Sequence, residues 1–237
     1  MLIADGVVVH RAGAPVVQGV EMHVGPGEVV ALLGANGAGK TTFLEAVCGL
    51  LPVEAGSVTA LGTAHPGVRP QQLARRGIVF VPESRALFPG LTVRENVLVR
   101  TRSRRVADEA LQRFPLLEPL VHRKAGALSG GEQQLLALVC ALSMNPTLLI
   151  VDELTMGLSP TAVTDLLRTV RDVADKGVSV LFVDQHVHAA LGVADRAYVM
   201  RRGRVALSGS AAEVATRTEE LNASYLTAGI EVPPASV

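Results

Sequence analysis

The chain has 237 residues, of which 49% are hydrophobic, and its 22 basic side chains balance its 22 acidic ones. This apolar content supplies a sizeable core and excludes disorder as the main state, while the zero net charge argues against a histone-like or polybasic protein. Aromatic residues make up only 3% of the sequence, so a platform that stacks single-stranded nucleic acid is not expected. We therefore expect an aliphatic core and no nucleic-acid partner.

The N-terminal part predicts a small antiparallel layer. Residues Leu2–His10 and Gly19–Val24 alternate between apolar and polar side chains, and Gly13, Ala14 and Pro15 between them are typical of a turn. Alternation of this kind indicates strands with one buried face. The layer leads into the first strand that reads as buried on both faces.

Four short β-branched runs predict the centre of a sheet, and helical patterns lie between them. The predicted strands are Val29–Leu33, Ile78–Val81, Leu148–Val151 and Val178–Val183. The predicted helices are Lys40–Leu50, Val93–Arg100, Gly130–Met144 and Pro160–Ala174, the last with Ser159 as its N-cap. Alternating strands and helices predict an α/β fold with a mainly parallel sheet and right-handed crossovers.

The stretch from Ser84 to Asn145 separates two of these strands by more residues than a simple crossover needs, and its pattern is mainly helical. We interpret residues 84–145 as an inserted helical subdomain. Residues 1–83 and 146–237 then form the α/β core with its β layer, and the whole chain is a single domain.

A phosphate-binding loop follows the first buried strand and precedes a helix, which is the context such a loop requires. Its glycines let backbone N–H groups turn toward a phosphate, Lys40 reaches the β and γ phosphates, and Thr41 ligates Mg²⁺. The loop consists of Gly34, Ala35, Asn36, Gly37, Ala38, Gly39, Lys40 and Thr41. The sequence therefore predicts ATP and Mg²⁺ as cofactors.

Two acidic residues, Asp152 and Glu153, end the strand Leu148–Val151. In a phosphate-loop protein the first acid reaches the shell of the magnesium ion, and the second orients or deprotonates the attacking water. Taken alone, such a pair is more often a helix cap. The phosphate loop in the same chain favours the catalytic interpretation.

A second glycine-containing helix start lies at Leu128-Ser129-Gly130-Gly131-Glu132. Ser129 and Glu132 form a capping-box pattern, which leaves the two glycines unexplained. Glycine is unfavourable in a helical first turn, so Gly130 and Gly131 indicate close approach of the backbone to an anion. This predicts a second phosphate-binding surface.

These motifs together resemble the nucleotide-binding subunits of ABC transporters, and the likeness covers nearly the whole chain. It rests on the order and spacing of Gly34–Thr42, Leu128–Gln133, Leu148–Glu153 and Gly157–Pro160. The resemblance implies that Thr42 also lies in the nucleotide site. It further implies that Ser129, Gly130 and Gly131 address the γ phosphate held by a second ABC ATPase subunit, in a homodimer or a heterodimer.

Within that family the chain looks most like the LivF type of branched-chain amino-acid transporter ATPase. The likeness rests on Val81–Arg85, Phe88–Asn96, Val183–His186 and Ser224–Leu226. It implies an ATP-hydrolysing subunit that powers an importer, with transmembrane permease subunits as partners and a solute-binding protein as an indirect one. The subunit would be peripheral, at the cytoplasmic face of the cell membrane. Alternatives are an importer for urea, amides or another small polar solute, and a soluble ABC ATPase outside transport.

Several positions depart from the usual pattern of the family. Glu83, which the resemblance implies is a magnesium ligand, stands where most members have Gln. The switch histidine aligns with Gln185, and His186 follows one place later, so either can contact the γ phosphate. Ser159 replaces the usual Asp. Arg11 stands where an aromatic residue stacks on adenine, and its guanidinium can also stack on a base.

Overall fold

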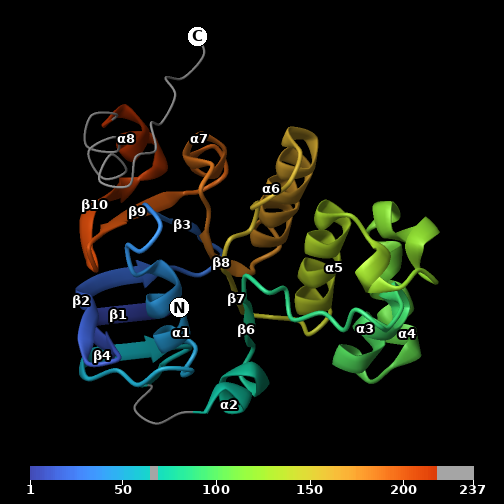
Figure 1. The fold of residues 1–237 in the computed structure, drawn as a ribbon, viewed down its shortest axis with the longest axis horizontal. Coiled ribbons are helices and arrows are strands. Elements are labelled where there is room, and N and C mark those ends of the chain that lie inside the picture. Colours follow the sequence, from blue (N-terminus) through green and yellow to red (C-terminus); the bar gives the residue numbers. More distant parts are fainter. Residues whose placement is uncertain (65–68, 218–237) are drawn as a thin grey trace.

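The computed structural model describes residues 1–64 and 69–217, which form two sheets flanked by helices, with a group of helices to one side (Figure 1). Ser224–Leu226, one of the segments behind the predicted subfamily, lies outside the described residues. None of the helices in the described part of the chain has the length and apolar composition needed to cross a membrane.

The central sheet has six strands in the order β10-β9-β3-β8-β7-β6. The strands β3, β6, β7, β8 and β9 are parallel, and β10 pairs antiparallel with β9. This confirms the predicted fold class. The bounds are β3 (Val29–Leu33), β6 (Ile78–Val81), β7 (Leu148–Val151), β8 (Ser179–Val183), β9 (Arg196–Arg201) and β10 (Arg204–Ser210).

The smaller sheet is antiparallel and has the order β2-β1-β4-β5. Its first two strands are longer than predicted, because Ala14 and Pro15 pair with Arg11 and His10 instead of forming the turn. The predicted turn at Gly13–Pro15 is therefore wrong by two residues. The bounds are β1 (Leu2–Arg11), β2 (Ala14–Val24), β4 (Ala55–Ala60) and β5 (Thr63–Ala64).

The two faces of the central sheet bury different partners. On one face, side chains of β3, β7 and β8 pack against the helices α5, α6, α7 and α8. On the other face they pack against α1 and the antiparallel layer. The helices are α1 (Lys40–Val47), α2 (Pro70–Arg75), α5 (Gly130–Leu142), α6 (Pro160–Ala174), α7 (Val187–Leu191) and α8 (Ala211–Thr216).

Two predicted helices end earlier than their patterns suggest. The helix α1 stops at Val47, because Gly49 takes a φ of +68° and the amide of Leu50 turns back to the Glu45 carbonyl. The helix α5 stops at Leu142, two residues before the predicted end. By contrast, α6 has its predicted bounds, and Ser159 caps it by accepting a hydrogen bond from the Ala162 amide.

The chain between β6 and β7 is mainly helical, as predicted, and it has a hydrophobic core of its own. The helix α5 contributes to this core and also to the core beneath the central sheet, so it joins the two. The subdomain boundaries at residues 84 and 145 stay a prediction. The further elements here are α3 (Val93–Thr101), α4 (Arg104–Gln112) and the 3₁₀ helices η1 (Pro115–Leu120) and η2 (Ala125–Ala127).

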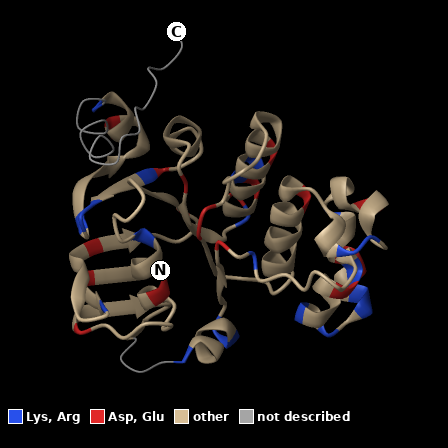
Figure 2. Ribbon diagram, viewed as in Figure 1, with Lys and Arg blue, Asp and Glu red and all other residues tan. Residues whose placement is uncertain are grey.

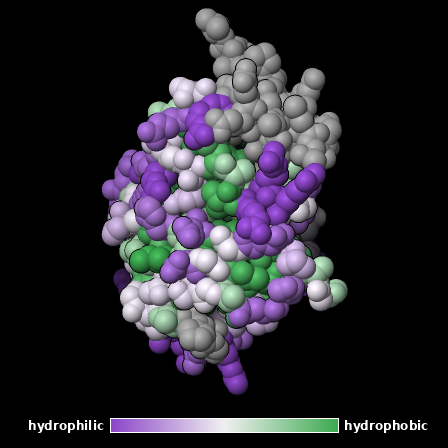
Figure 3. Space-filling view, turned by 90° about the vertical axis from the view of Figure 1, so that its left-hand side faces the viewer, coloured by the Kyte–Doolittle hydropathy of each residue, from purple (hydrophilic) through white to green (hydrophobic). Residues whose placement is uncertain are grey.

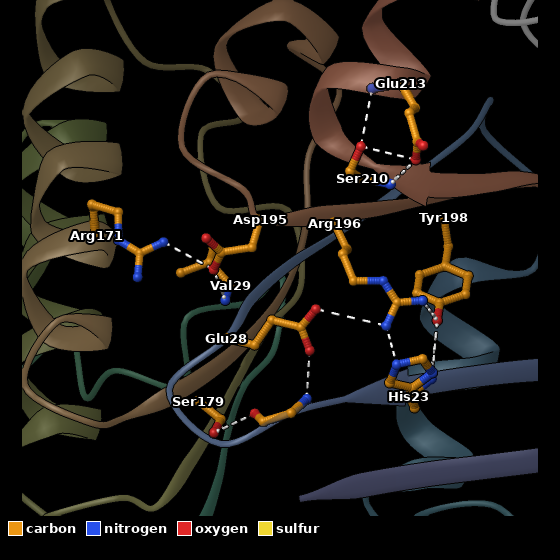
Figure 4. A network of polar contacts seen from close by, with 11 residues as sticks. His23, Glu28, Val29, Arg171, Ser179, Asp195, Arg196, Tyr198, Ser210 and Glu213 are labelled. Carbon is orange, nitrogen blue, oxygen red and sulfur yellow. Dashed lines mark hydrogen bonds and ion pairs between the residues drawn. The ribbon is translucent and has the colours of Figure 1, made fainter.

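A polar network joins the two sheets at the edge where β3 begins (Figure 4). Arg196 on β9 contacts His23 on β2, donates to the Tyr198 hydroxyl at 2.9 Å and lies 3.7 Å from Glu28. Nearby, the Asp195 carboxylate accepts a hydrogen bond from the Val29 amide at 2.8 Å. The contacts of Arg196 and Tyr198 with His23 join the antiparallel layer to the central sheet at the edge opposite to the phosphate loop.

Charged and apolar residues are unevenly distributed over the surface. Acidic residues lie on the antiparallel layer, on α6 and in an acidic centre between the two, and basic residues are prominent on the helices around α4 (Figure 2). On the face turned toward the viewer in Figure 3, apolar residues form separate patches bordered by polar side chains. The acidic centre coincides with the carboxyl ends of β7 and β8, where the candidate site lies.

Candidate functional site

Four neighbouring parallel strands carry the predicted catalytic segments at one edge of the central sheet. The strands β3, β8, β7 and β6 lie side by side, and their carboxyl ends face the same way. The phosphate loop follows β3, Gln185 comes soon after β8, Asp152 and Glu153 follow β7, and Glu83 comes soon after β6. The carboxyl edge of a parallel sheet is where ligands bind in open α/β folds.

The phosphate loop needs glycine at two of its positions. A Cβ at Gly34, which has a φ of +140°, would lie 2.3 Å from the Met200 carbonyl oxygen. A Cβ at Gly39, with a φ of +102°, would lie 2.8 Å from the carbonyl oxygen of Val16 on β2. The loop is therefore wedged between β9 and the β1–β2 hairpin, which fixes its backbone.

Lys40 is buried at the first position of α1, and its ammonium group lies within the loop. Its Nζ donates to the carbonyl oxygens of Gly34 at 2.7 Å and Ala35 at 3.0 Å. Burial lowers the pKa of this lysine, and the charges of Glu153 and Asp152 oppose that shift. A positive charge is thus held where the loop receives an anion.

Asp152 is 1% exposed, and among the described residues only the neighbouring Thr41 hydroxyl approaches its carboxylate, without a hydrogen bond of normal geometry. Burial raises its pKa to about 6, the charges of Glu153 and Glu83 add to this, and the nearby Thr41 hydroxyl and Lys40 charge oppose it. A buried carboxylate without a partner is unfavourable unless a cation neutralises it. The residues present therefore fit Mg²⁺, for which Asp152 and Thr41 would be ligands, with Glu83 beside them.

Within residues 1–64 and 69–217 no three His, Cys, Asp or Glu side chains gather to hold a metal ion. A magnesium ion at Asp152 would be held together with the Thr41 hydroxyl, beside Glu83, and with the phosphates of a nucleotide. Such an arrangement is typical of Mg²⁺ sites in phosphate-loop proteins, where the metal and the nucleotide bind together.

Glu153 and Gln185 meet at the carboxyl edge. The Gln185 amide nitrogen donates to both carboxylate oxygens of Glu153, at 2.9 and 3.1 Å. Glu153 has a φ of +53°, a backbone conformation that is uncommon for residues other than glycine and that turns it away from the strand direction. Of Gln185 and His186, the two candidates for the switch residue, the structure brings Gln185 to the predicted catalytic carboxylate.

His186 has different partners. Its Nδ1 lies 2.8 Å from the Thr155 hydroxyl, which in turn donates to Asp184 at 2.7 Å. The Asp184 carboxylate also accepts from the His186 amide at 2.8 Å. Thr155 and Asp184 are both buried, and sequence reasoning assigned neither a role. They tie the loop after Glu153 to the loop that carries Gln185.

Ser129, Gly130 and Gly131 open the helix α5. The Ser129 hydroxyl accepts from the Glu132 amide at 3.3 Å, and the Glu132 carboxylate accepts from the Ser129 amide at 2.7 Å, so the predicted capping box is present. Ser129 and Gly131 line a groove between α5 and α6, together with Ser159. A Cβ at Gly131 would lie 3.3 Å from the Ala162 side chain, so close packing on α6 also favours glycine here.

Arg11 lies at the end of β1, within the hairpin that contacts the phosphate loop. Its guanidinium forms an ion pair with Glu45 on α1, and about half of the side chain is exposed. The structure therefore places Arg11 next to the helix that begins with Lys40. That it stacks on a nucleotide base stays a prediction.

Comparisons with known proteins agree with this geometry. The family model described as ABC transporter matches residues 17–156. The high-affinity branched-chain amino acid transport ATP-binding protein BraG of Pseudomonas aeruginosa is 36% identical, over 91% of this chain and 95% of its own length. The probable branched-chain amino acid transport ATP-binding protein LivF of Archaeoglobus fulgidus is 35% identical over 82% and 86%. The lipopolysaccharide export system ATP-binding protein LptB of Haemophilus influenzae is 31% identical over 95% and 97%.

Solved structures of cassettes from ABC transporters have the same fold. The ADP conformation of the cassette MJ1267 is similar with a TM-score of 0.85 and 25% identity, over 93% of this chain and 96% of that one. The dimeric structure of the cassette MJ0796 is similar with a TM-score of 0.80 and 25% identity, over 89% and 99%. The chain therefore belongs to the ABC transporter family as an ATP-binding, ATP-hydrolysing subunit.

Proposed function

We propose that this chain is the ATPase subunit of an importer for branched-chain amino acids. The observation that carries the proposal is the convergence of Lys40, Asp152, Glu153 and Gln185 at one edge of the sheet, in a chain 36% identical to BraG. The subunit would bind peripherally to transmembrane permease subunits at the cytoplasmic face of the membrane. A solute-binding protein would be its indirect partner.

Each residue at the edge has a proposed role in the hydrolysis of ATP. Glu153 accepts the proton of the attacking water, and Gln185, already hydrogen-bonded to that carboxylate, orients it. Lys40 leaves the loop carbonyls to bind the β and γ phosphates. Asp152 and Thr41, with Glu83 beside them, would hold Mg²⁺. The bound ion would neutralise the negative charge of the phosphates.

The second phosphate-binding surface implies a dimer. Ser129 and Gly131 lie in the groove between α5 and α6, while the phosphate loop follows β3. A helix N-terminus with two glycines suits an anion, and a partner subunit can bring its own nucleotide there. The dimeric cassette MJ0796, similar over most of this chain, supports this arrangement. ATP would then lie between two subunits.

The similarity to LptB favours a second candidate, the export of lipopolysaccharide. That relative covers 95% of this chain, so both candidates share nearly every described element. Import of urea or amides, and a soluble ABC ATPase outside transport, are further alternatives. All of these share the ATPase chemistry and differ in the membrane partner.

The membrane partner is tested by purifying the tagged chain from detergent-solubilised membranes and identifying the proteins that accompany it. We expect permease subunits, and ATPase activity that rises when they are reconstituted with a binding protein loaded with leucine, isoleucine or valine. The same binding protein without any solute, or with glucose added, is the control. Stimulation by urea or an amide alone, a lipopolysaccharide-exporting partner, or the absence of any membrane partner would contradict the proposed solute.

A testable consequence concerns the base of the nucleotide. If the Arg11 guanidinium covers the base, few hydrogen bonds distinguish adenine from guanine, so GTP should compete with ATP within about a hundredfold in affinity. Arg11→Tyr should keep ATP binding, because it restores an aromatic surface for the base. Glu45→Gln should weaken the binding of both nucleotides, because the Arg11 guanidinium is then no longer held in place by its ion pair. Competition binding with a fluorescent ATP analogue measures this. A preference for ATP greater than a hundredfold in the wild-type chain would reject the role of Arg11.

A further inference from the structure

The segment that follows Glu83 has an unusual backbone. Arg85 and Ala86 have φ values of +63° and +50°, so two successive residues other than glycine adopt left-handed conformations. Each such residue costs free energy, and the conformation persists only where surrounding contacts hold it. Side chains of α3 and α5 make the contacts that hold this turn.

The guanidinium of Arg85 binds two successive side chains of the helix α5. Its Nε donates to the Gln134 amide oxygen at 2.9 Å, and its Nη1 donates to the Gln133 amide oxygen at 2.8 Å. Gln134 is buried, so this contact does not depend on a freely moving surface residue. The planar guanidinium can serve both oxygens at once, which a lysine ammonium cannot do with the same geometry.

Gln133 continues the connection to the residues before Ser129. Its amide nitrogen donates to the carbonyl oxygens of Ala125 at 3.2 Å and Leu128 at 3.1 Å. A path of hydrogen bonds therefore runs from the segment beside Glu83, through Arg85 and Gln133, to the residue that precedes Ser129. Arg85 also lies close to the opening of α5, because a Cβ at Gly130 would be 3.9 Å from its Nη2.

Other contacts hold the same segment to the helices of residues 84–145. Arg100 on α3 donates to the Ala86 carbonyl oxygen at 2.7 Å. The buried Asn96 accepts from the Phe88 amide at 2.8 Å and donates to the Phe88 carbonyl oxygen at 3.1 Å. The segment is thus anchored to α3 and α5, while Glu83, directly before it, raises the pKa of Asp152.

We propose that Arg85 is a positioning residue that links the magnesium end of one subunit's site to the Ser129 surface that the same subunit presents to its partner's ATP. The proposal rests on the proposed function, in which two subunits enclose the nucleotides. A change at Glu83 when nucleotide binds then shifts Ser129, so each site in the dimer responds to the other. The positive-φ turn at Arg85 and Ala86 is the element that transmits the shift.

The test compares Arg85→Ala and Arg85→Lys with Arg94→Ala. Arg94 forms an ion pair with Asp108 at 2.6 Å among the same helices, so its removal controls for the loss of a charged contact. We expect both Arg85 variants to lower kcat by about tenfold and to reduce the Hill coefficient for ATP toward one. Affinity for ADP, which does not close the dimer, should be unchanged by calorimetry, and Arg94→Ala should leave kcat and the Hill coefficient as in the wild type.

Gln133→Ala tests the path itself. Combined with Arg85→Ala, it should lower kcat no further than either single change, because both interrupt one connection. Arg85 variants with the kcat and Hill coefficient of the wild type would overturn the proposal while the proposed function stands. A wild-type chain that hydrolyses no ATP would instead overturn the proposed function. Thermal unfolding of every variant shows that lost activity does not come from an unfolded chain.

Discussion

Replacing Glu153 with Gln is expected to lower the rate of ATP hydrolysis by roughly 10²- to 10⁴-fold while ATP continues to bind. Glu153 is the carboxylate that receives two contacts from Gln185 at the carboxyl edge of β7. The amide of Gln keeps the size and shape of the side chain but cannot accept a proton from water. The loss should therefore fall on kcat and leave nucleotide affinity nearly unchanged.

Phosphate release under saturating ATP and Mg²⁺ measures this effect. Glu109→Gln is a matched control, because Glu109 lies on α4 in an exposed ion pair with Arg105. The control should hydrolyse ATP at the wild-type rate. Turnover by Glu153→Gln close to that of the control would show that another group activates the water.

Replacing Lys40 with Ala should weaken the binding of ATP itself. The ammonium group is buried in the phosphate loop, and its charge-assisted hydrogen bonds to phosphate oxygens contribute about 1.5–3 kcal/mol, which corresponds to roughly ten- to hundredfold in affinity. Because the residue binds the ground state, the dissociation constant should rise even when turnover is blocked. This separates its role from that of Glu153.

Isothermal titration calorimetry with ATP and Mg²⁺ gives the affinity directly. Lys124→Ala is the matched control, since Lys124 is exposed at the residue before η2 and does not line the groove between α5 and α6. The control should bind ATP like the wild type, and thermal unfolding should show that Lys40→Ala remains folded. An unchanged affinity in Lys40→Ala would place the phosphates elsewhere.

Much of the core was predictable from the sequence because it is built from continuous apolar runs. The strands β3, β6 and β7 have the predicted bounds, and α6 has both its predicted start at Pro160 and its predicted end. The strand β4, with the sequence AGSVTA, has no continuous apolar run. Its small residues also do not alternate clearly between apolar and polar, so the sequence does not predict a strand there. The strand β4 forms because β1 lies beside it.

The candidate site was predictable as a set of residues and not as a set of contacts. Motif spacing indicated Lys40, Asp152 and Glu153, but the hydrogen bonds from Gln185 to Glu153 join residues 32 positions apart. They depend on β7 and β8 being neighbours in the sheet, which no local pattern encodes. The link from Arg85 to Gln133 likewise spans 48 positions and depends on how α5 packs.

We propose that two copies of this chain close around ATP, rather than one copy and a different ABC ATPase subunit, and the mass of Glu153→Gln in solution tests this most directly. Light scattering should give the 24.8 kDa of one chain without nucleotide and about twice that mass with ATP and Mg²⁺. The dimer should not form with ADP, and Lys40→Ala in the same background should prevent it. A mass that stays at one chain under saturating ATP and Mg²⁺, while calorimetry shows that ATP is bound, would contradict the account.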